Sequence, residues 1–157
     1  MKKIKQVQVA QKAVTFHNLK RKKSVLLIKY DKYKLKSSSG VLTAKFGFPG
    51  GRLKFGEDLD KSLISECKEE TGILIKPLDP IGLSTWTVEK EDHINQIVAI
   101  FRLCKYIKGS LKRKIIDEAP IEQAEWIGID SFDFNKNMIK TELPVLKKAL
   151  KIYGIIK

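Results

Sequence analysis

The chain has 157 residues, of which 43% are hydrophobic and 31% are charged, a balance typical of one globular domain rather than of a disordered protein. Lysine and arginine number 31 against 18 aspartate and glutamate, which gives a net charge of +13. This charge either belongs to a lysine-rich solvated surface, the favoured interpretation, or attracts polyanions such as nucleic acids, anionic membranes and phosphate-rich small substrates. No apolar run approaches the roughly 20 residues of a membrane span, and the N-terminus has no export signal, so we expect a soluble protein with one domain over residues 1–157 and no membrane partner.

The N-terminal segment predicts an antiparallel hairpin. Residues 7–16 and 24–30 are rich in apolar and β-branched residues and predict two strands. The polar residues 17–23 between them predict a turn, with Asn18 as its best turn residue. Residues 31–44 are polar and serine-rich and predict a surface loop.

A sharply shaped loop is expected next. Phe46 and Phe48 precede Pro49, Gly50 and Gly51, and the two glycines allow backbone conformations that other residues avoid. The two aromatic rings, like that of Trp86 further on, either stack on a nucleobase or belong to the core.

Residues 58–71 predict the best helix of the chain. Apolar side chains recur at every fourth position, at Leu59, Leu63 and Cys67. Asp58 is a suitable N-cap, and Gly72 is a suitable C-terminal stop.

The rest of the chain predicts further strands and a final helix. The segments rich in apolar and β-branched residues are 73–75, 81–88, 94–106 and 124–129. Residues 76–80 contain two prolines and are expected to interrupt the strands, and residues 142–153 have the apolar spacing of a helix that lies on a sheet. The predicted fold class is α/β, with a mixed β-sheet between helices.

The two cysteines, Cys67 and Cys104, have neither CxxC spacing nor a nearby histidine partner. We expect buried thiols, which suit a reducing, cytoplasmic compartment.

Three carboxylates share one face of the predicted helix, because Glu66, Glu69 and Glu70 are separated by three and four residues. Like charges at this spacing repel, so an offsetting cation is expected, and hard oxygen ligands suit Mg²⁺ or Mn²⁺. The alternative is a solvated acidic helix end. The glycines just upstream favour the metal site, because their backbone can approach the same ion or a phosphate.

These residues resemble the Nudix box of the MutT-like Nudix hydrolases, which is written G-x5-E-x7-R-E-U-x-E-E-x-G-U with U a bulky apolar residue. The matching positions are Gly51, Glu57, Glu66, Cys67, Glu69, Glu70, Gly72 and Ile73. The resemblance implies an α/β/α sandwich with a mixed β-sheet. It also implies hydrolysis, with Mg²⁺ or Mn²⁺, of a phosphoanhydride bond in a nucleoside di- or triphosphate derivative.

The resemblance also implies residue roles. Glu69 and Glu70 would be the principal metal ligands, and Glu66 a further ligand or the base that activates water. The carbonyl of Gly50 would be an additional ligand, and Glu57 a supporting group. The expected catalytic residues are thus Glu66, Glu69 and Glu70, and the expected substrate-binding residues are Gly50, Gly51, Phe48 and Trp86. An acidic residue from a later loop often completes such a site, and the candidates are Glu118, Glu122 and Glu125.

The chain departs from the box at Ser65, which occupies the position of an arginine thought to orient a box glutamate. Either a basic residue from elsewhere substitutes, or activity survives in weakened form, or the domain binds nucleotides without cleaving them. The net charge adds a further alternative, an RNA-directed protein that removes caps or binds RNA. The resemblance leaves a homodimer open as the oligomeric state.

Overall fold

The computed structural model describes residues 2–30, 45–112 and 121–153. Within these segments the strands are β1 (Ile4–Leu19), β2 (Lys22–Tyr30), β3 (Lys45–Gly47), β4 (Gly50–Arg52), β5 (Ile73–Glu89), β6 (His93–Gly109) and β7 (Ile121–Gly128). The helices are α1 (Leu59–Thr71), α2 (Phe134–Asn137) and α3 (Leu143–Ile152). The loop expected at residues 31–44 lies outside the described residues.

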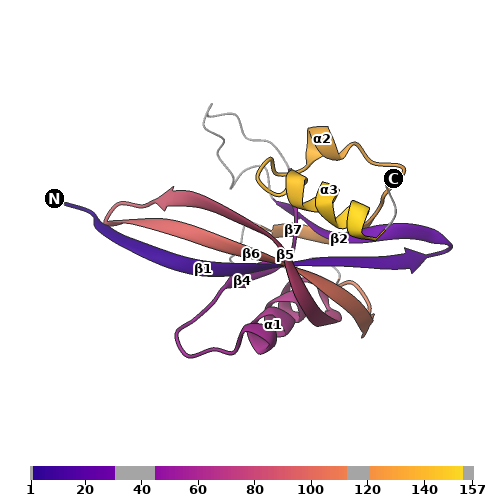
Figure 1. Cartoon of the computed structure of the whole chain (residues 1–157), viewed down its shortest axis with the longest axis horizontal. Coiled ribbons are helices and arrows are strands. Elements are labelled where there is room, and N and C mark those ends of the chain that lie inside the picture. The colour runs from indigo at the N-terminus through magenta and orange to yellow at the C-terminus, as the bar shows by residue number, and fades with distance from the viewer. Residues whose placement is uncertain (1, 31–44, 113–120, 154–157) are drawn as a thin grey trace.

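The strands form one mixed sheet in the order β3-β2-β1-β6-β5, with β4 paired to β1 and β7 paired to β2. The long β1 and β6 pair in parallel, whereas the other pairs are antiparallel. Helix α1 covers one face of this sheet, and α2 and α3 lie on the other (Figure 1). The α/β/α sandwich with a mixed sheet is therefore confirmed.

Two hydrophobic cores result from the alternation of side chains along the strands. Leu26 of β2 packs in the core that contains Leu63 of α1, whereas the next residue, Leu27, packs in the core that contains Leu146 of α3. The sheet thus packs against α3 on one face and against α1 on the other.

Helix α1 begins and ends as predicted. The Asp58 side chain caps its first turn by accepting a hydrogen bond from the backbone N–H of Lys61 at 2.9 Å. The helix ends at Gly72, whose φ of 81° lies in the left-handed region. These two caps fix the register of the helix and therefore the direction of its glutamates.

The β1–β2 turn corrects one prediction. Leu19 pairs with Lys22, so the turn consists of Lys20 and Arg21, whose φ values are 48° and 66°. A two-residue turn with two positive φ values matches the right-handed twist of the flanking strands. Asparagine and glycine are common in such turns because they tolerate positive φ. Asn18 is paired within the ladder instead, so its assignment as the turn residue is wrong.

The two prolines do not separate strands, contrary to expectation. β5 runs through them, with Pro77 opposite Cys104 and Pro80 opposite Arg102, and the register shifts on either side of Pro80. β5 lies at the edge of the sheet, where a residue without a backbone N–H is tolerated.

The remaining predicted strands agree with the structure apart from their ends, but the short strands β3 and β4 lie where only a sharply shaped loop was expected. The final predicted helix is α3, whose buried side chains face the sheet, whereas the short α2 was not predicted. Cys67 and Cys104 are free thiols with 0% exposure, and burial raises the pKa of each to about 12. None of the helices in the described segments has the length and apolar character needed to cross a membrane.

Candidate active site

The glycine turn presses β4 onto β1. Gly50 pairs with Lys12 and Gly51 pairs with Gln11. A β-carbon at Gly50 would lie 1.9 Å from the carbonyl oxygen of Gln11, far inside van der Waals contact. Glycine is therefore required at position 50 for the two strands to meet.

Helix α1 brings two of its glutamates to this turn. The carboxylate of Glu66 packs against Gly51, because a β-carbon at Gly51 would lie 2.6 Å from the Glu66 Cδ. Glu70 makes a hydrogen bond with the backbone of Gly50. Glu69 is more exposed, so the structure brings Glu66 and Glu70 to the glycines while Glu69 lies at the rim.

The site concentrates negative charge. Burial raises the pKa of Glu70 to about 8, and the nearby Glu66 and Glu69 add to the rise. Burial also raises the pKa of Glu66, with Glu69 as the next cause. The carboxylates therefore disfavour one another's ionisation, which a nearby positive charge would offset.

A partly buried polar cluster that sequence reasoning missed lies beside Glu70. Lys12 Nζ and Tyr30 Oη are 3.4 Å apart, and Glu142, only 3% exposed, accepts a hydrogen bond from the backbone N–H of Phe48 at 3.2 Å. Burial opposes the charge of Lys12, but Tyr30, Glu142 and Glu70 together raise its pKa above the ordinary value. These residues come from β1, from the end of β2 and from the start of α3, and no local motif links them.

Ser65 keeps contact with Glu69 despite the departure from the box. Its hydroxyl donates a hydrogen bond to Oε1 of Glu69 at 3.2 Å. The serine therefore contacts the glutamate four residues further on, but it supplies no positive charge.

A cavity of about 190 Å³ opens next to Gly51, and its lining includes Lys12, Arg52 and Trp86. Gly51 also contacts the carboxylate of Glu66. Because glycine has no side chain, residue 51 places no β-carbon between the cavity and that carboxylate. Trp86 thus lines a cavity beside the glycine turn, and its role in substrate binding stays a prediction.

Phe48 does not agree with its expected role in substrate binding. Its side chain is 0% exposed, and its ring centroid lies 6.0 Å from that of Phe101 in the core. A buried ring cannot stack on a nucleobase, so Phe48 is a core residue. Phe46 is partly buried and packs edge-on against Phe132 at 5.1 Å.

The other expected site residues are Glu57 and the acidic candidates from the later loop. Glu57 accepts a hydrogen bond from the backbone N–H of Lys54 at 2.6 Å and contributes to the raised pKa of Glu66. Glu125 lies opposite Leu27, which packs in the core that contains α3, so it is on that face of the sheet. Glu118 and the side chain of Glu122 lie outside the described residues. Across the described segments, no three acidic, histidine or cysteine side chains converge closely enough to enclose a metal ion.

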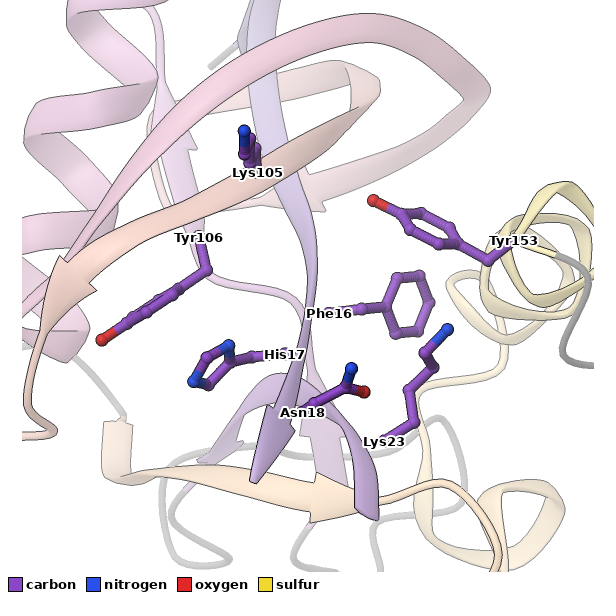
Figure 2. Close-up of a pocket in the computed structure, with 7 residues that line it drawn as sticks. All are labelled: Phe16, His17, Asn18, Lys23, Lys105, Tyr106 and Tyr153. Atoms are coloured by element: carbon purple, nitrogen blue, oxygen red, sulfur yellow. The ribbon is translucent and has the colours of Figure 1, made fainter. Parts of the chain in front are cut away.

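A second cavity, of about 230 Å³, lies at the turn end of β1 (Figure 2). It is lined by aromatic and cationic side chains that include Phe16, Lys23, Lys105 and Tyr153. Lys23 Nζ lies 5.4 Å from the centre of the Tyr153 ring. None of the expected site residues lines this cavity.

The fold and the glutamate-bearing helix beside a glycine turn define a Nudix-type domain. A family model described as NUDIX domain matches residues 9–149, and the chain belongs to that family, the family of the Nudix hydrolases.

Individual proteins resemble the chain in sequence or in fold. The chain is 26% identical over 108 residues to the "Uncharacterized Nudix hydrolase YvcI" of Bacillus subtilis (strain 168), a match that covers 69% of this chain and 66% of that protein, just under two thirds of its length. The fold of the present chain is similar to that of a NUDIX hydrolase from Nitrosomonas europaea, with a TM-score of 0.67 and 18% identity. The match covers 96% of this chain and 95% of that chain. A MutT NUDIX hydrolase from Burkholderia pseudomallei gives a TM-score of 0.65, 19% identity and coverage of 91% and 98%.

Proposed function

We propose that the protein is a metal-dependent pyrophosphohydrolase that cleaves a phosphoanhydride bond in a nucleoside di- or triphosphate derivative. One observation carries the proposal: the box carboxylates Glu66 and Glu70 meet the glycine turn next to a cavity lined by cations and an aromatic ring. Negative phosphates, a base and a divalent ion each have a matching group in this arrangement.

The box glutamates have the donor chemistry of a divalent-ion site, although in the described segments their side chains do not converge closely enough to enclose an ion. Glu66, Glu69 and Glu70 offer hard oxygen atoms, the donor type that Mg²⁺ and Mn²⁺ prefer. Burial and mutual repulsion raise the pKa of Glu66 and Glu70, which a bound cation would relieve. When bound, such an ion neutralises diphosphate charge, lowers the pKa of an attacking water and stabilises the displaced phosphate oxygen.

The chain's own groups bind and orient the substrate. Lys12 and Arg52 line the cavity and supply positive charge for the phosphates, while Trp86 offers a ring for the nucleobase. Glu66 lies against Gly51 and is the group best placed to accept a proton from the attacking water.

The test is a hydrolysis screen with and without Mg²⁺ or Mn²⁺. Its panel contains ADP-ribose, dinucleoside polyphosphates, nucleotide sugars, oxidised nucleoside triphosphates and capped RNA. We expect at least one substrate to be cleaved and no product to form when EDTA is present. Glu70→Gln should lower the rate of hydrolysis by at least about 100-fold. Glu91→Gln, an exposed carboxylate, is the matched control and should behave as wild type. Micromolar nucleotide binding without turnover of any substrate would favour a nucleotide sensor instead.

The cavity of Figure 2 favours a second candidate function, an RNA-directed activity. It combines the ring of Tyr153, which is 37% exposed, with the charges of Lys23 and Lys105, the pairing of stacking surface and cation that binds single-stranded nucleic acid. If this function holds, RNA affinity should fall steeply with salt, and Lys23→Ala with Lys105→Ala should make the dependence shallower. Affinity that does not change with salt would exclude it.

A further inference from the structure

The missing box arginine leaves a charge to be accounted for. Ser65 donates one hydrogen bond to Glu69, but a hydroxyl cannot offset the charge of clustered carboxylates. The described segments contain lysine side chains near the box. These lysines differ in which atoms they contact and in how deeply their side chains are buried.

Two of these cations are poorly placed. Lys112 donates from Nζ to the backbone carbonyl of Glu69 at 2.9 Å rather than to its carboxylate. Lys54 opposes the rise in the pKa of Glu66, but its side chain is exposed, so water and salt screen its charge.

Lys12 is placed differently. It lies on β1 directly opposite Gly50, whose backbone hydrogen bonds with Glu70. Its ammonium group is 3.4 Å from Tyr30 Oη and interacts with the charges of Glu142 and Glu70. A charge inside this cluster acts through a lower dielectric than an exposed one, so its attraction for a carboxylate is stronger.

We propose that Lys12 supplies, from a strand outside the box, the positive charge that Ser65 lacks, and that it is the positioning residue for the carboxylate of Glu70. This inference rests on the proposed function for its catalytic consequence, but the position of Glu70 affects metal affinity whether or not a substrate is cleaved. In this chain the orienting cation has moved from the helix to the sheet.

The test is a double-mutant cycle between Lys12→Met and Ser65→Arg in the full chain. Its first readout is Mn²⁺ affinity without substrate, measured by titration calorimetry, and its second is kcat and KM. We expect Lys12→Met to weaken Mn²⁺ binding and kcat by about 10–100-fold. Ser65→Arg alone should change the Mn²⁺ affinity and kcat little. In the Lys12→Met background, Ser65→Arg should raise both the Mn²⁺ affinity and kcat by at least about tenfold.

The rescue separates positioning from other roles of Lys12. Lys12 also lines the cavity, so a higher KM in Lys12→Met is expected to persist in the double variant, because residue 65 lies on α1 and is not part of the lining. Lys5→Met, an exposed lysine on the same strand, makes the same charge change and should resemble wild type. Lys12→Arg should retain most of the Mn²⁺ affinity, and Lys12→Gln replaces Lys12→Met if the latter does not fold.

Additive effects of the two substitutions, with no recovery in a folded double variant, would overturn the proposal. Wild-type Mn²⁺ affinity in Lys12→Met would overturn it too, even if the enzyme is active. Conversely, weakened and rescued Mn²⁺ binding in a protein that cleaves no substrate would support the role of Lys12 and reject the proposed function.

Discussion

The carboxylate of Glu66 rests on the α-carbon of Gly51, where a β-carbon would come within 2.6 Å of Cδ and 2.7 Å of Oε2. Its neighbour Gly50 has a different constraint, since its missing β-carbon would strike the Gln11 carbonyl oxygen at 1.9 Å. One glycine makes room for a flexible side chain and the other for the backbone of β1.

This difference predicts separate consequences for two alanine substitutions. Gly51→Ala should displace Glu66 and lower kcat about 10–100-fold while the melting temperature changes little, because a side chain can move aside. Gly50→Ala should lower the free energy of unfolding by about 1–3 kcal/mol, because the backbone cannot. Chemical denaturation and kinetics of both variants check this, with Gly56→Ala, where nothing lies within 4 Å, as the control for loss of a positive-φ glycine. Equal stability losses in the first two variants would contradict the assignment.

Glu70 predicts a pH dependence of stability in the metal-free protein. Folding raises its pKa from the usual 4.5 to about 8, mainly through burial. A carboxyl whose pKa is raised contributes stability that is fully present below the unfolded pKa and is lost as the pH rises through the folded one. Wild type should therefore lose stability between pH 4.5 and 8 relative to Glu70→Gln, by at most about 1.4 kcal/mol per pH unit. Urea denaturation in EDTA across this range measures the difference, and a gap that is constant with pH would rule the explanation out.

The β1–β2 turn is a site where stability can be gained. Lys20 and Arg21 both adopt left-handed conformations, which cost a residue with a β-carbon roughly 1–2 kcal/mol. Lys20→Asn with Arg21→Gly should raise the free energy of unfolding by about 1–2 kcal/mol and the melting temperature by several degrees. The same pair placed at Lys22 and Lys23, within the ladder, should destabilise instead. Thermal denaturation of the two variants measures these changes in stability. A melting temperature that does not rise in the Lys20→Asn, Arg21→Gly variant would contradict the turn geometry.

The sequence predicts those parts of the site that depend on local spacing. Glu66 and Glu70 reach the glycine turn because the caps at Asp58 and Gly72 fix the helix, and all of these residues lie in one continuous segment. Helical periodicity is sufficient to place them on one face.

The parts that depend on long-range pairing were not predictable in this way. Lys12 and Glu142 meet near Glu70 only because β1 pairs with β4 and α3 packs across the sheet. The continuity of β5 through Pro77 and Pro80 depends on its place at the sheet edge, which topology decides. The burial of Phe48 likewise follows from which face of the sheet its short segment presents to α3.

Trp86 provides the last prediction, which separates a ligand contact from a core contact. The ring lines the cavity beside Gly51, yet it also packs against the core that contains α3. If the ring stacks on the nucleobase, Trp86→Ala should raise KM for the cleaved nucleotide about tenfold, equivalent to about 1.4 kcal/mol of binding, with kcat little changed. Leu83→Ala on the same strand, where the side chain is 72% exposed, is the control and should leave KM as it is. A fall in melting temperature of several degrees with an unchanged KM would identify Trp86 as a core residue, because its contacts would then stabilise the fold without touching the substrate.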